Sequence, residues 1–189
     1  MERRTAAVQQ TRQAILEATM RCHARHGILA TTVQDVAREA DVALGTVYRH
    51  FPTLNDLVAA CGQASLESLG LPDRQAAKQR FHGVRARAKR IAVLVDAVAS
   101  LYQPAAQSFV AVREAAGTLP AAAQGHQLME HAIDMLIDEA LRPLRVSANQ
   151  RRTVRALLDA RFWETLTEHG LETESKRREL TRLLGCALR

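Results

Sequence analysis

Residues 31–57, TTVQDVAREADVALGTVYRHFPTLNDL, limit the possible folds more than any other stretch of the chain. Their first half predicts a short helix, because one apolar face repeats at i, i+3, i+4 and i+7. The residues of this face are Val33, Val36, Ala37 and Ala40. Thr32 and Asp35 have the spacing of a capping box at its N-terminus. Asp41 follows where the chain must leave the helix, and aspartate tolerates a left-handed turn better than most residues.

The second half of this stretch predicts another short helix, Leu44–His50, directly after the turn. Val47 and Phe51 are four residues apart and face inward, and Pro52 stops the helix. Thr53 and Asp56 form a second capping-box pair, which begins a longer helix. Two short helices with this spacing are typical of a helix-turn-helix, in which the second helix enters a DNA major groove.

The segment GTVYRHFPT, preceded by TTVQDVAREADV, resembles the DNA-binding signature of TetR-type bacterial transcriptional repressors. The resemblance covers about a quarter of the chain, from Arg12 to Leu57. It implies a three-helix DNA-binding head, a ligand-binding helical domain and a dimer. Four positions depart from the family pattern: Asp41 replaces glycine, Ala43 replaces a capping serine or threonine, Leu54 replaces a phosphate-anchoring lysine, and His23 replaces an aromatic residue.

Two side chains are predicted to contact base edges. Arg49 on the second short helix favours guanine, and Gln34 on the first favours adenine. Leu44 is suited to a thymine methyl group, and Gly45 lies at the small, polar start of the second helix. The resemblance implies phosphate or backbone contacts for a further set: Thr32, Thr46, Tyr48, His50 and Thr53. Two alternatives stay open, that Tyr48 is partly core and that Arg49 is merely solvated.

The remaining chain predicts an all-α fold of about nine helices, with an N-terminal three-helix head and a C-terminal antiparallel bundle. The low aromatic content of 4% and the many alanines favour closely packed helices over sheets. We expect a helix-turn-helix domain at residues 1–58 and a ligand-binding and dimerisation domain at 59–189. The helices are expected at residues 11–26, 33–40, 44–50, 54–69, 85–102, 104–117, 118–141, 147–169 and 173–188. The inner face of the helix at 118–141 is expected to hold Leu128, Ile133, Leu136 and Ile137.

The last two expected helices expose more apolar surface than one small bundle can cover, which predicts a two-fold dimer. The expected interface residues are Val154, Leu158, Phe162, Leu180 and Leu184. A pocket between the middle helices is the default site for an unknown small-molecule effector. Its candidate lining residues, which are equally suited to a solid core, are Tyr102, Phe109, Arg113, Met129, Phe162 and Trp163.

The chain carries 26 Lys and Arg against 20 Asp and Glu, and this formal charge of +6 suits a polyanionic partner. Arg3 and Arg4 belong to a frayed terminus or to a basic arm that reaches DNA. Residues 74–90 hold seven basic residues and no acidic one. They predict a solvated face, with the alternative that Arg80, Arg85 or Arg87 turns inward to pair with an acidic ligand.

Other classes of protein are weakly supported. Metal ligands are conceivable at Cys22, His23 and His26, or along the row His126, Glu130, Asp134 with His131 beside it, but neither pattern predicts a metal or any cofactor. No nucleophile motif or phosphate loop is present, so we expect no enzyme. Three widely spaced cysteines predict reduced, buried thiols, and no apolar run is long enough to span a membrane, so a cytoplasmic protein is expected. A DNA-binding protein without an effector and a metal-binding helical bundle remain as alternatives.

Overall fold

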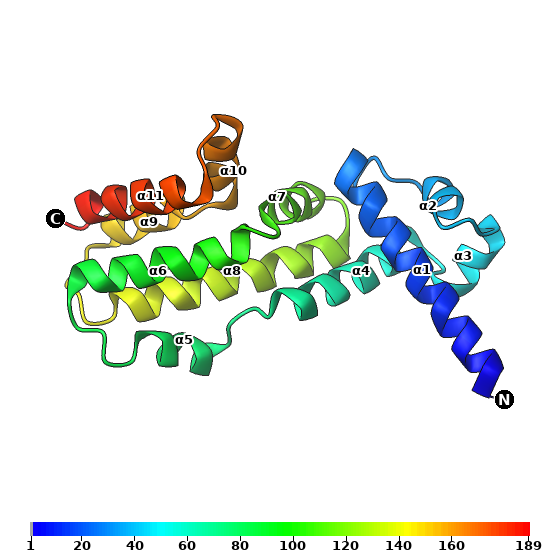
Figure 1. Cartoon of the computed structure of the whole chain (residues 1–189), viewed down its shortest axis with the longest axis horizontal. Coiled ribbons are helices and arrows are strands. Elements are labelled where there is room, and N and C mark those ends of the chain that lie inside the picture. The colour runs from blue at the N-terminus through cyan, green and yellow to red at the C-terminus, as the bar shows by residue number, and fades with distance from the viewer. Residues whose placement is uncertain (1) are drawn as a thin grey trace. The chain divides into compact units, whose positions relative to one another are not determined.

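The computed structural model describes the backbone of residues 2–189 and the side chains of residues 5–189. Every regular element in the described backbone is an α-helix, which confirms the all-α fold (Figure 1). The helices are α1 (Glu2–His26), α2 (Val33–Glu39), α3 (Leu44–His50), α4 (Leu54–Leu69), α5 (Arg74–Phe81), α6 (Arg87–Tyr102), α7 (Ala106–Ala115), α8 (Pro120–Leu141), α9 (Ala148–Leu157), α10 (Ala160–Glu168) and α11 (Thr173–Ala187).

Helix α1 begins earlier than the sequence predicted, at Glu2 instead of Thr11. The backbone of the N-terminal stretch is therefore helical, although the expectation was a frayed end. The predictions for the Arg3 and Arg4 side chains lie outside the described side chains. Helix α5 is an additional element in the basic stretch, where Asp73 caps the N-terminus by accepting a hydrogen bond from the Ala76 N–H at 2.7 Å.

The prediction of a single helix at residues 147–169 is wrong, because the helical backbone is interrupted between α9 and α10. The break lies at Leu158 and Asp159, and two side chains explain it. The Asp159 carboxylate accepts a hydrogen bond from the Arg161 N–H at 2.8 Å, which makes it the N-cap of a new helix. The Leu158 carbonyl accepts a hydrogen bond from the Tyr102 hydroxyl at 2.7 Å, so the interruption leaves no orphan carbonyl there.

The chain divides into two compact units. Unit 1 consists of residues 1–68 and 111–126, and unit 2 consists of residues 69–110 and 127–189, so the division passes through α7 and α8. The predicted boundary between residues 58 and 59 stays a prediction. In unit 1 a hydrophobic core joins the first four helices, and its buried residues are Ile15, Leu16, Ala18, Cys22, Val36, Ala37, Val47, Phe51, Leu57 and Cys61.

A second, smaller apolar cluster in unit 1 joins α4 to the α7–α8 connection. Its buried members are Ile28, Val58, Ala115 and Ala122, and Leu54 packs against them. The Asn55 side-chain oxygen accepts a hydrogen bond from the Ala121 N–H at 3.0 Å. Since Ala121 is in the first turn of α8, Asn55 satisfies one of the free N–H groups of that helix and acts as a cap supplied from α4.

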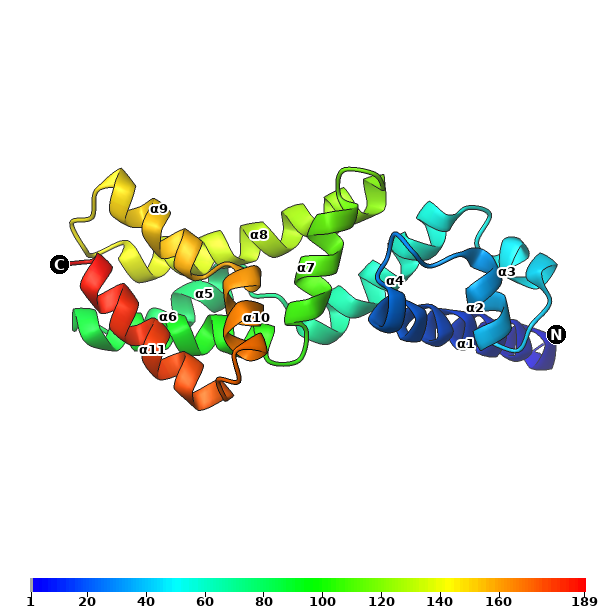
Figure 2. The same cartoon turned by 90° about the horizontal axis from the view of Figure 1, so that it is seen from above.

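Unit 2 is built around α6, whose apolar residues are buried on a wide arc. Helices α6 and α8 lie side by side in both views (Figures 1 and 2), and α11 packs against α6 and α9. Ile133, Leu136 and Ile137 of α8 are buried as predicted. Leu128 is 53% exposed, so its assignment to the inner face is wrong. The buried Met129 is the neighbouring residue that turns inward instead, about 100° further round the helix.

One arginine of the basic stretch does turn inward, but it is Arg90 and not Arg80, Arg85 or Arg87. Arg90 is only 6% exposed, and it donates hydrogen bonds to backbone carbonyls. In the alternative drawn from the sequence, the partner of an inward-facing arginine was instead an acidic ligand. Its guanidinium contacts the Ala140 carbonyl at 2.8 Å, the Val84 carbonyl at 2.5 Å and the Glu139 carbonyl. Arg80 and Arg85 are exposed, and Arg87 donates to the Leu188 carbonyl at 2.8 Å.

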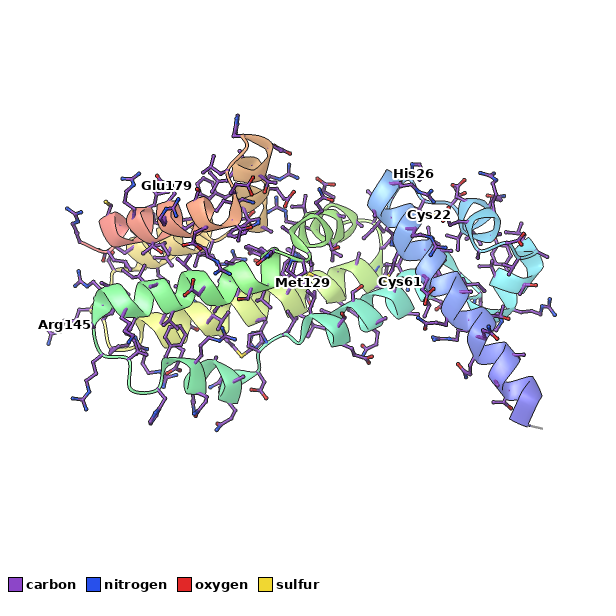
Figure 3. All side chains as sticks on the ribbon, in the orientation of Figure 1. Cys22, His26, Cys61, Met129, Arg145 and Glu179 are labelled. Atoms are coloured by element: carbon purple, nitrogen blue, oxygen red, sulfur yellow. The ribbon has the colours of Figure 1, made fainter. Side chains whose placement is uncertain are left out.

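The cysteines are free thiols, and two of the three are buried. Cys22 on α1 and Cys61 on α4 belong to the core of unit 1 (Figure 3). Burial raises the pKa of Cys61 to about 11, which keeps this thiol protonated at neutral pH. Cys186 on α11 is exposed, so the expectation of burial is wrong for that residue.

His23 makes unit 1 sensitive to acid. Its Nε2 is buried and has no hydrogen-bond partner among the described residues, and desolvation lowers the pKa of His23 from 6.5 to about 4. Because the folded pKa lies below the unfolded value, the unfolded chain takes up the proton first as the pH falls. The contribution of neutral His23 to the free energy of unfolding is therefore fully present above pH 6.5, and it is lost as the pH falls from about 6.5 to 4.

We expect the free energy of unfolding to fall over this interval by about 1–2 kcal/mol, discounted from the full shift because His23 is partly exposed. His23→Phe should remove this part of the pH dependence, since phenylalanine is apolar and has no proton to bind. The measurement is denaturant unfolding followed by circular dichroism from pH 7.5 to 4. The exposed His26 provides the control, and His26→Gln should keep the wild-type slope. An unchanged slope in His23→Phe contradicts the assignment.

Candidate nucleic-acid interface

The turn between α2 and α3 has the backbone geometry that the sequence predicted. Asp41 has a φ of 51°, and it is the one non-glycine residue with positive φ in the described chain. The Val42 N–H donates to the Ala37 carbonyl at 3.0 Å, which ends α2 and reverses the chain. A side chain at this φ is strained by roughly 1 kcal/mol relative to glycine. Aspartate is among the residues that tolerate it best.

Helix α2 is held at both ends. At its start the Thr32 N–H donates to Asp35 at 3.2 Å, and the Asp35 N–H donates to the Thr32 hydroxyl at 3.2 Å, which confirms the predicted capping box. At its end Glu39 accepts hydrogen bonds from two arginines of α1, from Arg21 at 2.7 Å and from Arg25. These exposed ion pairs contribute little energy each, but together they fix α2 against α1.

Helix α3 spans Leu44–His50, as the sequence predicted. Val47 is fully buried and Phe51 is 3% exposed, so one side of α3 is anchored in the core of unit 1. The Arg12 guanidinium lies over the Phe51 ring at 5.1 Å and adds a cation–π contact from α1. The opposite side of α3 is open: Gly45, Tyr48 and Arg49 are exposed, with Tyr48 at 45%. The alternative that Tyr48 is partly core is therefore wrong.

Arg49 folds back along its own helix. Its Nε donates to the Gly45 carbonyl at 3.2 Å, and its Nη2 donates to the Thr46 hydroxyl at 3.0 Å. Both bonds are exposed to solvent, so releasing them costs little. The guanidinium can therefore swing outward from a pre-ordered position.

The predicted contact residues divide by exposure. Thr32, Gln34, Gly45, Tyr48, Arg49 and Thr53 are exposed, whereas Leu44, Thr46 and His50 are half-buried. The Thr53 N–H donates to the Asp56 carboxylate at 3.0 Å, which confirms the second capping box. Leu54, where the family pattern has lysine, packs against the smaller cluster of unit 1 and offers no charge.

The sequence reasoning missed Arg38 on α2. Its side chain is 79% exposed and pairs with Asp35 at 3.3 Å. Arg38 lies four residues after Gln34, so both project from one face of α2. That spacing was visible in the sequence and supports a phosphate contact beside Gln34.

Ala43 is the N-cap of α3, and its methyl side chain makes no capping hydrogen bond. A serine there accepts a hydrogen bond from a free N–H of the first turn, so Ala43→Ser should raise the free energy of unfolding by about 1 kcal/mol. The corresponding rise in melting temperature is roughly 2–4 °C by calorimetry. Ala43→Val, which has no acceptor, should give no gain. A lower melting temperature for Ala43→Ser is the result that contradicts this helix start.

The candidate pocket residues form a packed aromatic group in unit 2. The Tyr102 ring meets the Phe109 ring edge-to-face at 5.1 Å and lies 6.0 Å from the Trp163 ring. All three are buried, and so is Met129, while Phe162 is half-buried. Lys176, which the sequence reasoning missed, is 4% exposed, with its Nζ 4.6 Å from the Trp163 ring centroid. Arg113 belongs to unit 1. A ligand-binding role for these residues stays a prediction.

The candidate dimer residues are mostly internal to one chain. Val154, Leu158, Leu180 and Leu184 are 0–3% exposed, and only Phe162 is half-buried. Helix α11 packs against both α6 and α9, so these buried leucines and the valine lie inside unit 2. The predicted dimer therefore depends on other residues of the same helices, and it stays a prediction.

The metal-ligand rows are not assembled. No group of three or more His, Cys, Asp or Glu side chains in the described residues is placed to hold a metal ion. Two members of the row on α8 are paired with α9 instead, since Arg155 donates to Glu130 and lies 3.7 Å from Asp134. Similarly, no described helix has the length and apolar character needed to cross a membrane.

Comparison with known sequences matches the head region. Residues 15–61 match the sequence model described as "Bacterial regulatory proteins, tetR family". Over 58 residues, 30% of this chain, the identity is 43% to the HTH-type transcriptional repressor KstR of Mycobacterium tuberculosis. The matched segment spans 26% of that repressor, so the chain covers about a quarter of the length of this relative.

Comparison with solved structures extends over most of the chain. A transcriptional regulator from Rhodococcus sp. Rha1 superposes with a TM-score of 0.69 at 18% identity, covering 94% of this chain and 95% of that one. The transcriptional regulator FadR from Bacillus subtilis, in complex with stearoyl-CoA, gives 0.63 at 14% identity, covering 94% and 99%. At these identities the likeness shows the fold.

Proposed function

We propose that the chain is a transcriptional regulator of the tetR family, whose sequence model matches residues 15–61, and that it binds an inverted-repeat operator as a dimer. The observation that carries the proposal is α3. Its inner residue Val47 is fully buried, while Tyr48 and Arg49 on the outer face are exposed. A helix presented in this way fits the major groove and reads base edges through Arg49.

Dimerisation follows from the geometry of readout. One head contacts only a few base pairs, and a two-fold dimer doubles the contacts over half-sites about 34–36 Å apart or a multiple of that. Such a protein requires an operator with two-fold symmetry. Repression is the proposed outcome, by occlusion of the operator.

The proposed effector is a small molecule held by unit 2. FadR, a structural neighbour with this fold, is in complex with stearoyl-CoA, which supports a helical bundle that admits a ligand. The aromatic group around Tyr102 is the proposed site. An effector can release DNA only by binding one conformation more tightly than the other, and the coupling is typically 1–3 kcal/mol.

The test is selection of bound sequences from random duplex DNA by the purified protein at a fixed, stated salt concentration. Enrichment of an inverted repeat supports the symmetric dimeric reader and supplies the operator for an effector screen. Recovery of unrelated sequences with uniform, salt-sensitive affinity contradicts the regulator proposal. An operator whose binding no candidate effector changes favours instead a DNA-binding protein without an effector.

A further inference from the structure

The net positive charge of the chain does not lie in the unit that contains α3. Unit 1, which contains α3, carries eight Lys and Arg and eight Asp and Glu, so it has no net charge. Unit 2 carries the other eighteen basic and twelve acidic residues, and therefore the whole excess of +6. Because affinity for DNA depends strongly on phosphate neutralisation, a head without net charge gains little affinity from its overall charge.

The excess positive charge of unit 2 is concentrated in residues 74–90, which hold seven basic residues and no acidic one. Two of these have structural partners: Arg90 is buried among carbonyls and Arg87 donates to the Leu188 carbonyl. The other five are exposed and make no hydrogen bond or ion pair within the described residues. They are Arg74, Lys78, Arg80, Arg85 and Lys89.

At least five of the eleven basic residues elsewhere in unit 2 form an ion pair with a carboxylate, among them Arg177 with Asp96 at 3.9 Å. Arg151 and Arg155 pair with carboxylates of α8, and Arg182 pairs with Glu179 at 2.5 Å. Arg142 pairs with Glu139 at 2.8 Å. The stretch 74–90 has no acidic residue of its own, and it holds the longest run of exposed cations in the unit without an ion pair in the described residues.

The free cations lie along α5, the loop after it and the first turn of α6, and α5 and α6 contact one another. Ala77 and Phe81 bury one side of α5 against α6, which leaves the basic residues of α5 outside. Arg90 then ties the end of α5 and the following loop to the end of α8, because it contacts the carbonyls of both. Arg145 projects near this end of α8 (Figure 3). We define the basic surface as Arg74, Lys78, Arg80, Arg85, Lys89 and Arg145.

We propose that the basic surface binds the phosphate backbone of duplex DNA and supplies salt-dependent affinity that the neutral head lacks. This inference rests on the proposed DNA-binding function. Two other partners fit less well. An anionic membrane calls for apolar side chains between the cations, and a single strand calls for aromatic platforms. Phe81, the one Phe, Tyr or Trp of residues 74–90, is buried.

The test compares two double variants with equal loss of charge. Arg85→Gln/Lys89→Gln removes two cations of the basic surface, and Arg152→Gln/Arg178→Gln removes two exposed cations of α9 and α11. Each protein is titrated with a random-sequence duplex between 50 and 200 mM salt. The first variant should lower the log–log salt slope by about 2, as expected for two lost phosphate contacts, while the control keeps the wild-type slope.

Three results overturn the inference: an unchanged slope in the first variant, an equal change in the control, or loss of binding to anionic phosphatidylserine vesicles with DNA binding unaltered. None of these affects operator selection by α3, which is scored separately on the selected sequence. Conversely, the proposed function alone is contradicted if the wild-type protein enriches no operator and the first variant still has a lower salt slope than the wild type.

Discussion

Replacing Arg49 with alanine is expected to reduce affinity for the selected operator roughly 5- to 150-fold per half-site, with little change for random duplex DNA. The estimate is the 1–3 kcal/mol that a bidentate contact from arginine to guanine contributes to discrimination. Arg49 is suited to that contact because it projects from the exposed face of α3 and is held only by its bonds to Gly45 and Thr46. The quantity measured is the ratio of operator affinity to random-duplex affinity at one salt concentration.

Arg49→Lys is the informative companion. Lysine keeps the charge but lacks the planar fork, so it should preserve the salt slope while losing much of the operator preference. Circular dichroism and sedimentation must show an unchanged fold and oligomeric state, as expected for an exposed side chain. If Arg49→Ala binds operator and random duplex in the wild-type ratio, Arg49 does not read bases, and Gln34 becomes the leading candidate.

The parts of the fold that the sequence predicted well depend on local chemistry. The two capping boxes at Thr32 and Thr53 each use a partner three residues away, and both form as expected. The bounds of α3 follow from the same kind of information, since the turn at Asp41 precedes it and Pro52 follows it. Interactions between residues so close in the chain can be predicted from the spacing of residue types in the sequence.

The parts that were missed depend on residues far apart in the chain. The break between α9 and α10 involves the hydroxyl of Tyr102, which reaches a carbonyl 56 residues away. Arg90 bonds to carbonyls 49 and 50 residues away, and nothing in its local sequence separates it from its exposed neighbours. The sequence predicts a partner chain over the apolar faces of α9 and α11, because periodicity does not show that α11 packs against α9 and α6 within the chain.

Arg90 is also the residue whose loss should cost the structure most. Helix α8 ends at Leu141, so the carbonyls of Glu139 and Ala140 have no partner within the helix. The Arg90 guanidinium donates a hydrogen bond to each of these two carbonyls and another to the Val84 carbonyl in the loop after α5. Its positive charge also lies at the negative end of the α8 dipole. Burial lowers the pKa of Arg90, but an arginine stays charged at any ordinary pH.

Arg90→Met should lower the free energy of unfolding of unit 2 by about 3 kcal/mol, because charge-assisted bonds are lost and buried carbonyls stay unpaired. Methionine keeps an apolar stem but lacks the guanidinium, which lies 5.0 Å from the Phe81 ring centroid. Urea unfolding followed by tryptophan fluorescence reports on this unit directly, since Trp163 is the one tryptophan of the chain and lies in unit 2.

Arg87→Met is the matched control, since this exposed arginine makes a single bond to the Leu188 carbonyl, and its loss should cost at most about 1 kcal/mol. Arg90→Lys should fall between the two variants, because an ammonium reaches fewer of the carbonyls. Equal midpoints for Arg90→Met and Arg87→Met are the result that removes Arg90 from this role. The basic surface would then lose the contact that holds the end of α5 to the end of α8, so the two proposals for unit 2 are linked through one guanidinium.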